Sequence, residues 1–125
     1  MRLLWFRMQR DQRPKVTTLL DRFDHAGMDV EIIMMSGHYH RNQNLPQCAL
    51  IMLECVESVE HEMLAQLNEV RATSKAPLIV LTDNHTLDWS LLALREGADA
   101  IFTLNTPDDI ILARSTALIR RWLPK

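Results

Sequence analysis

Three side chains able to do chemistry stand where short apolar runs of this sequence end. They are Arg7, Glu54 and Thr82, and each follows or closes such a run. A guanidinium pairs with carboxylates, a carboxylate holds cations, and a hydroxyl hydrogen-bonds to anionic oxygens. What these residues do therefore depends on whether the fold brings them together.

Other groups of reactive residues form weaker sets. His38, His40 and Cys48 suggest a metal, but zinc needs about four nitrogen or sulfur ligands and the segment holds too few, so we interpret it as a polar loop. Cys48 and Cys55 stand at opposite ends of one apolar run, too far apart for a disulfide, and no base that would activate Cys55 is evident. The sequence has no Ser-His-Asp motif and no glycine-rich phosphate loop, so we expect no enzyme activity, cofactor or metal.

Composition sets the broad class. The chain has 125 residues, 47% of them hydrophobic and 24% charged, which is ordinary for one globular domain. Its net charge of -2, without a clustered basic excess, argues against direct contact with nucleic acid. Its longest apolar run, residues 49–53, is far below the roughly 20 residues of a membrane helix, and its N-terminal apolar run is too short for a signal peptide. Two cysteines fit a reducing compartment, so we expect a cytoplasmic protein.

Short apolar runs alternate with longer amphipathic stretches. The apolar runs predict buried strands at residues 3–6, 30–35, 49–53, 78–81 and 100–104. The amphipathic stretches predict four helices, which begin near Pro14, Ser58, Thr86 or Asp88, and Thr106, and end near Gly27, Thr73, Gly97 and Trp122. This alternation indicates a parallel sheet covered by helices on both faces, with ligands bound at the carboxyl ends of the strands.

The second half of the chain carries motifs in a characteristic order. Residues 77–82 read Pro-Leu-Ile-Val-Leu-Thr, residues 96–99 read Glu-Gly-Ala-Asp, and a last helix follows Pro107. In this order they resemble the receiver domains of two-component response regulators, over residues 46–122 by motif and residues 2–35 by pattern. The resemblance implies a flavodoxin-like (CheY-like) α/β three-layer sandwich, with five parallel strands ordered 2-1-3-4-5. The domain would span residues 1–122, and residues 123–125 would start a linker or form the C-terminus.

The same resemblance implies a chemistry that this chain has largely lost. In receiver domains a histidine kinase supplies a phosphoryl group to an Asp after the third strand, an acidic pair holds Mg²⁺, and a Thr and a Lys bind the phosphoryl oxygens. At the matching positions stand Glu54 for the acceptor, Arg7 and Met8 for the acidic pair, and Leu104 for the Lys, so only Thr82 remains. We predict that Arg7 takes the place of the metal and pairs with Glu54; the alternative is that both side chains point into water.

Two further departures concern surfaces. Residues 36–47 are turn-rich where the family has a helix, so we predict that the helix between the second and third strands is shortened or missing. In the family, the surface formed by the fourth helix, fifth strand and fifth helix carries signals, often through symmetric dimers. We predict a homodimer face there. Asp99 and Arg114 match charged positions of that face in the family, and Trp89, Leu92 and Ile110 would add apolar surface to it.

The favoured interpretation is a degenerate receiver domain that takes no phosphoryl group. It would act as a dimerisation or protein-interaction module of a transcriptional regulator resembling the winged-helix subfamily, with a DNA-binding domain fused outside this chain. One alternative is a phospho-accepting receiver domain that uses Glu54, Thr82 and Asp83 in a phosphorelay. Another is a sensor of a small ligand bound in the vacated site, which Leu104 makes more apolar.

Overall fold

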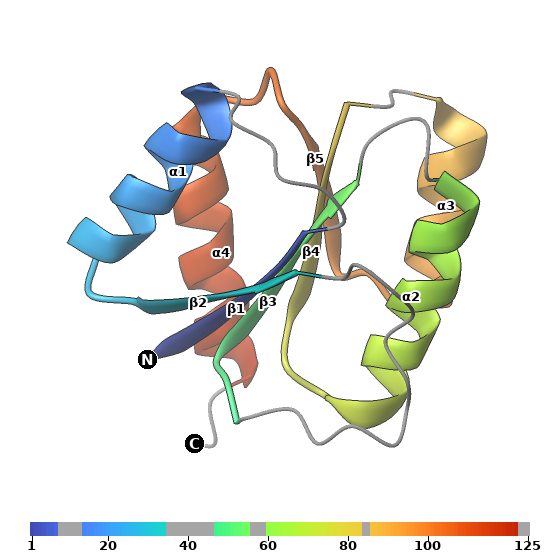
Figure 1. Ribbon diagram of the computed structural model, residues 1–125, viewed down its shortest axis with the longest axis horizontal. Helices are drawn as coiled ribbons and strands as arrows, with labels where there is room; N and C mark the ends of the chain where they lie inside the picture. Colours follow the sequence, from blue (N-terminus) through green and yellow to red (C-terminus); the bar gives the residue numbers. More distant parts are fainter. Residues whose placement is uncertain (8–13, 35–46, 56–59, 84–85, 123–125) are drawn as a thin grey trace.

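A parallel sheet between two layers of helices makes up the molecule (Figure 1). The computed structural model describes residues 1–7, 14–34, 47–55, 60–83 and 86–122. The sheet order is β2-β1-β3-β4-β5, with all neighbours parallel. Helices α1 and α4 lie on one face, and α2 and α3 on the other. The flavodoxin-like topology expected from the sequence is confirmed.

The strands and helices follow the predicted alternation closely. The strands are β1 (Arg2–Arg7), β2 (Asp29–Met34), β3 (Leu50–Cys55), β4 (Leu78–Thr82) and β5 (Ala100–Thr103). The helices are α1 (Pro14–His25), α2 (Glu60–Thr73), α3 (Leu87–Glu96) and α4 (Asp108–Trp122). Gly27 and Gly97 adopt φ angles of 89° and 123°, which side chains disfavour, so the predicted glycine stops after α1 and α3 are confirmed.

The core lies on both faces of the central strands. Because successive side chains of a strand point to opposite faces, Trp5 of β1 packs towards α1 and α4, whereas Phe6 packs towards α2 and α3. Every residue of β3 and β4 is buried. Glu54 and Thr82 belong to these two buried strands and lie at their carboxyl ends.

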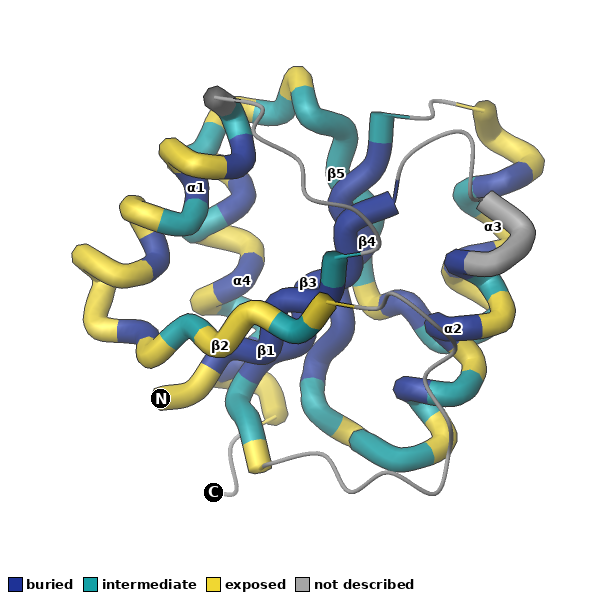
Figure 2. Tube along the Cα trace, in the orientation of Figure 1, coloured by how far each residue is buried: buried dark blue, intermediate teal, exposed yellow. Residues whose placement is uncertain are grey.

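The edge strand β2 departs from the expected pattern. Helices on both faces of the sheet were predicted, and Ile32 and Met34 are nevertheless 47% and 42% exposed, so the cover is incomplete at β2 (Figure 2). The physical reason is its place at the edge of the sheet, where only β1 lies beside it. The predicted loss of a helix at residues 36–47 falls almost wholly outside the described residues and stays a prediction.

Within the described parts of the chain, no helix has the length and apolar character needed to cross a bilayer.

Candidate functional site

Arg7 and Glu54 meet at the carboxyl edge of the sheet. Phe6 of β1 is aligned with Leu53 of β3, so the next residue of each strand, Arg7 and Glu54, stands beside the other. Arg7 Nε lies 2.8 Å from Glu54 Oε1, and the two side chains are only 11% and 5% exposed. The predicted ion pair is confirmed, and the alternative in which both side chains point into water is wrong.

A second donor reaches the same carboxylate. The Trp5 indole Nε1 donates a hydrogen bond to Glu54 Oε1 in the buried interior. The Trp5 ring is itself held edge-to-face against Phe23 of α1, with ring centres 6.3 Å apart. Sequence reasoning treated Trp5 only as a core residue. Strand alternation was the available signal, because Trp5 and Arg7 are two residues apart and therefore share a face of β1.

The cation and the indole together satisfy a carboxylate that burial would otherwise destabilise. A charged carboxylate moved out of water needs a paired charge and hydrogen-bond donors, and Glu54 has both. Such a site does not suit Mg²⁺, which prefers oxygen ligands and is repelled by a guanidinium. Among the described residues, no group of three or more His, Cys, Asp or Glu side chains could hold a metal ion. The residues present therefore do not fit the divalent ion that the fold family implies.

Thr82 lies on the neighbouring strand, one position further along. It is fully buried and is aligned with Cys55 of β3 and Thr103 of β5, while Glu54 is aligned with Leu81. Alternation therefore directs Thr82 to the opposite face of the sheet from Glu54. The backbone N–H of Leu104 donates to the carbonyl of Thr82 at 3.0 Å. The hydroxyl and the carboxylate thus stand on adjacent strands without sharing a face.

A lysine that sequence reasoning missed, Lys15 of α1, contacts the residues that follow β5. Leu104, at the family's Lys position, is half-buried against the α1 and α4 side of the core. Nearby, Lys15 of α1 donates to the carbonyl of Thr106 and lies 2.6 Å from Asp108 Oδ1. This amine therefore ties α1 to the start of α4. Met8, the other expected residue of this rim, lies outside the described residues.

The two cysteines are free, as predicted, and both are protected. Cys55 is fully buried at the carboxyl end of β3, and Cys48 is half-buried ahead of its amino end. Burial raises the pKa of the Cys48 thiol above its ordinary value, while a hydrogen bond with Ser74 opposes that change. The raised pKa leaves less of the Cys48 thiol as the nucleophilic thiolate, and Cys55 is shielded from solvent by burial.

The predicted interaction face is partly corrected by the structure. Ile110 and Leu92 are 48% and 44% exposed, and Arg114 is also exposed, as expected. The expectation that Trp89 adds apolar surface is wrong: it is only 5% exposed, because α3 packs on the sheet through this side chain. Asp99 is engaged within the chain, where its carboxylate binds Arg71 at 2.9 Å and the backbone N–H of Leu78 at 2.8 Å.

An exposed leucine stripe on α3 was also missed. Leu87, Leu91 and Leu94 are 71%, 43% and 46% exposed. Their spacing of four and three residues places them on one side of the helix. This spacing was readable from the sequence, but the neighbouring Trp89 and Leu92 were preferred there.

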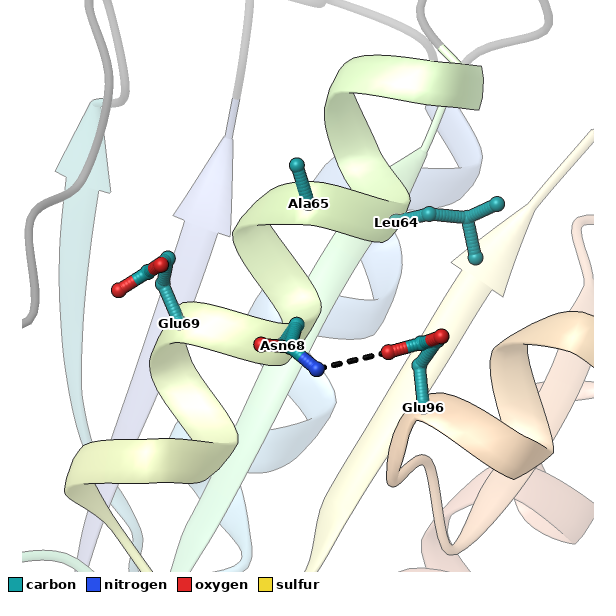
Figure 3. Close-up of a pocket in the computed structure, with 5 residues that line it drawn as sticks. All are labelled: Leu64, Ala65, Asn68, Glu69 and Glu96. Atoms are coloured by element: carbon teal, nitrogen blue, oxygen red, sulfur yellow. Dashed lines mark hydrogen bonds between the residues drawn. The ribbon is translucent and has the colours of Figure 1, made fainter.

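A shallow hollow lies between α2 and α3, away from Glu54 (Figure 3). Its volume is about 290 Å³. Figure 3 shows Asn68 Nδ2 donating to Glu96 Oε2 across it at 2.7 Å, so the two helices are joined there rather than held apart. The side chains around the hollow are Leu64, Ala65, Asn68, Glu69 and Glu96.

Comparison with known proteins identifies the fold. No protein-family model matches the sequence, and no curated protein is found as a relative. A two-component response regulator from Clostridium difficile matches with a TM-score of 0.74 and 19% identity, over 99% of each chain. The BeF3-activated receiver domain of Klebsiella pneumoniae RstA has a TM-score of 0.69 and 19% identity, over 96% of this chain and 99% of its own. A protein described as pilus assembly protein CpaE2, from Sinorhizobium meliloti 1021, has a TM-score of 0.64 and 14% identity, over 95% and 99%. The chain therefore has the fold of response-regulator receiver (CheY-like) domains.

Proposed function

We propose that this chain is a regulatory module with a receiver fold that accepts no phosphoryl group and works through protein contacts. The observation that carries the proposal is the buried set of Arg7, Glu54 and Trp5 at the carboxyl edge of the sheet. In a phospho-accepting receiver domain this edge holds a carboxylate that is open to a phosphodonor and a metal that neutralises the incoming charge.

Neither the open carboxylate nor the metal site is provided by the residues at this edge. Glu54 Oε1 is already engaged by a guanidinium and an indole N–H, and the Glu54 side chain is 5% exposed. Attack through this oxygen would require it to give up both partners, and either oxygen of the carboxylate would have to approach an anion without a divalent ion beside it. The Arg7 charge replaces the metal's charge permanently, so the site has one stable electrostatic state instead of two.

Treatment with acetyl phosphate and Mg²⁺ tests this role. Intact-mass spectrometry should show no added phosphoryl group in the native protein. The variant Arg7→Asp, Glu54→Asp restores two acidic side chains at the edge and serves as a comparison in the same assay. A phosphorylated peptide that contains Glu54, in the native protein, would contradict the proposal and favour an unusual phosphorelay receiver domain.

We further propose that the module forms homodimers through α3, β5 and α4. Ile110 and Leu92 are half-exposed apolar residues on these helices, and Arg114 adds an exposed charge. Exposed apolar surface in a soluble domain often marks a contact site. Dimerisation without a phosphoryl switch would make the module constitutive, and transcriptional regulation through a DNA-binding domain outside this chain is the output we propose.

One similar structure suggests a second setting. CpaE2 is described as a pilus assembly protein rather than as a response regulator. A receiver-fold module with the same interaction role in an assembly protein is therefore the second candidate. The two settings differ in what the module is joined to, and protein expressed with its native flanking sequence would separate them by binding or failing to bind promoter DNA.

A further inference from the structure

The leucine stripe of α3, formed by Leu87, Leu91 and Leu94, is not used in holding the helix to the sheet. Trp89 and Ala93 do that work and are buried. The stripe faces away from α2, because Glu96 and Leu92, four residues apart, lie on the α2 side, where Glu96 accepts a hydrogen bond from Asn68. Leucines spaced in this way form the seam by which two helices pair.

Two side chains of opposite charge lie beside the leucine stripe, both on the same side of it. Asp88 follows Leu87, and Arg95 follows Leu94, so each charge stands one residue beyond a seam leucine. Both side chains are exposed, and neither forms an ion pair with another described residue. The negative charge lies near the start of the helix and the positive charge near its end.

We propose that the leucine stripe packs against the same stripe of a second copy of this chain, with the two α3 helices antiparallel about a twofold axis near Leu91. Reversing one helix sets Asp88 of each copy beside Arg95 of the partner subunit, so two crossed ion pairs form at once. A parallel pair would set like charges at the same height. Antiparallel helices also oppose their macrodipoles favourably. The charge pattern therefore complements itself, as a symmetric dimer requires.

This inference rests on the homodimer proposed above and supplies its central contacts. Helices α3 and α4 lie on opposite faces of the sheet (Figure 1), and Ile110 and Arg114 of α4 are both exposed. A ten-residue helix offers too small a surface for a stable dimer by itself, and we propose that Ile110, which is 48% exposed, extends the apolar contact. Asp99 is held by Arg71 of its own chain, which leaves the contact centred on the leucines.

Charge-reversal variants test the antiparallel arrangement. Asp88→Arg and Arg95→Asp each oppose like charges twice across the axis, so each should weaken dimerisation about tenfold. An equimolar mixture allows a heterodimer in which both crossed pairs have opposite charges again, and its affinity should return towards that of the native protein. Sedimentation velocity measures all three samples, and raising the salt concentration should shrink the differences. Asp24→Arg, an exposed reversal on α1, is the matched control and should leave the dimer unchanged.

The outcomes separate the two proposals. A mixture that dimerises no better than either single variant overturns the antiparallel seam. If Ile110→Asp abolishes the dimer while both charge variants leave it intact, the α3, β5 and α4 face is upheld and the seam is overturned. Leu91→Asp should give a folded monomer with an unchanged circular dichroism spectrum. A native protein that stays monomeric at every concentration overturns both the seam and the homodimer.

Discussion

An arginine–carboxylate pair stands at each end of the sheet, and the two pairs do different work. At the amino end, Arg71 of α2 binds Asp99 at 2.9 Å and also donates to the backbone carbonyls of Gly97 and Ala76, at 3.0 and 2.9 Å. At the carboxyl end, Arg7 pairs with Glu54, whose other described donor is the Trp5 indole. The first pair joins chain segments, whereas the second joins side chains of strands that the sheet already holds together.

This difference separates a pair that joins chain segments from one that lies between two neighbouring strands of the sheet. Arg71 closes the end of α2 onto the turn before β5, where the carbonyls need donors. A buried ion pair between strands contributes little net stability compared with apolar residues, because both charges lose their water. The Arg7–Glu54 pair lies at the carboxyl edge of the sheet, where the function proposed above gives the guanidinium the role of the divalent ion.

Removing one charge at the carboxyl end should have the largest effect on stability. Arg7→Ala leaves Glu54 buried without its cation and should lower the free energy of unfolding by about 3–5 kcal/mol, measured by urea denaturation. The double variant Arg7→Met, Glu54→Leu removes both charges and should recover most of the loss. A single variant that loses less than about 1 kcal/mol, the value typical of an exposed pair, would show that the pair is not buried in solution.

Removing the arginine at the amino end should cost less. Arg71→Met keeps the side chain's packing but leaves carbonyl groups and Asp99 without a donor in a partly exposed place, and it should cost about 1–3 kcal/mol. Because Asp99 is 25% exposed, water can replace part of what is lost. In contrast to the carboxyl end, Asp99→Asn in the Arg71→Met background should recover little. A loss as large as that of Arg7→Ala would remove the distinction between the two ends.

The turn beside Arg71 allows a smaller, purely steric test. Gly97 has a φ of 123°, and a Cβ placed there would lie 2.7 Å from Arg71 Cγ. Gly97→Ala should therefore cost about 2 kcal/mol in thermal unfolding, from backbone strain and crowding together. Gly27→Ala is the matched control, because its φ is also positive but nothing lies within 4 Å of the added carbon. Equal losses in the two variants would contradict the close packing of Arg71 on this turn.

The alkylation rates of Cys48 and Cys55 probe the amino and carboxyl ends of the sheet, and we expect the smallest effects here. Burial raises the pKa of the Cys48 thiol, so at pH 8 less of it is thiolate than in a free cysteine, and alkylation should be several-fold slower than for a model peptide. Cys55 is fully buried and should react only when the carboxyl end opens. Arg7→Ala should speed modification of Cys55 and leave Cys48 unchanged. Faster modification at Cys48 alone would place the disturbance at the wrong end.

Much of this fold was predictable from sequence because local signals and tertiary structure agree. The apolar runs, the glycine stops and the order of the motifs each predict the same parallel sheet, and the Arg7–Glu54 pair follows from the strand order and the matching positions that the resemblance implies. Trp5 was overlooked as a hydrogen-bond donor to Glu54, although strand alternation places it on the same face as Arg7, because an indole in a buried run usually serves in packing. Trp89 was misjudged, because helical spacing predicts which residues share a side but not which side meets the sheet.

The contacts of Arg71 could not be predicted from the sequence for a different reason. Its partners, Ala76, Gly97 and Asp99, are joined to it by loop geometry and by backbone carbonyls, which have no sequence signature. The Lys15 contact with Asp108 likewise depends on how α1 and α4 sit beside each other. Charged contacts between strands in register are thus easier to predict than contacts made through turns.

The central claim is that Glu54, held by Arg7 and Trp5, accepts neither a metal nor a phosphoryl group. Its most direct test observes the Trp5 indole N–H by nuclear magnetic resonance while Mg²⁺ and beryllofluoride are added. This proton is bonded to Glu54, so any ligand that takes the carboxylate must move its resonance. Trp5→Phe assigns the signal, and the signals of Trp89 and Trp122 serve as internal references. We predict that the Trp5 resonance does not shift as Mg²⁺ and beryllofluoride are raised together. A saturable shift confined to Trp5 would contradict the account, because it would mean that Glu54 still accepts the metal and the phosphoryl mimic.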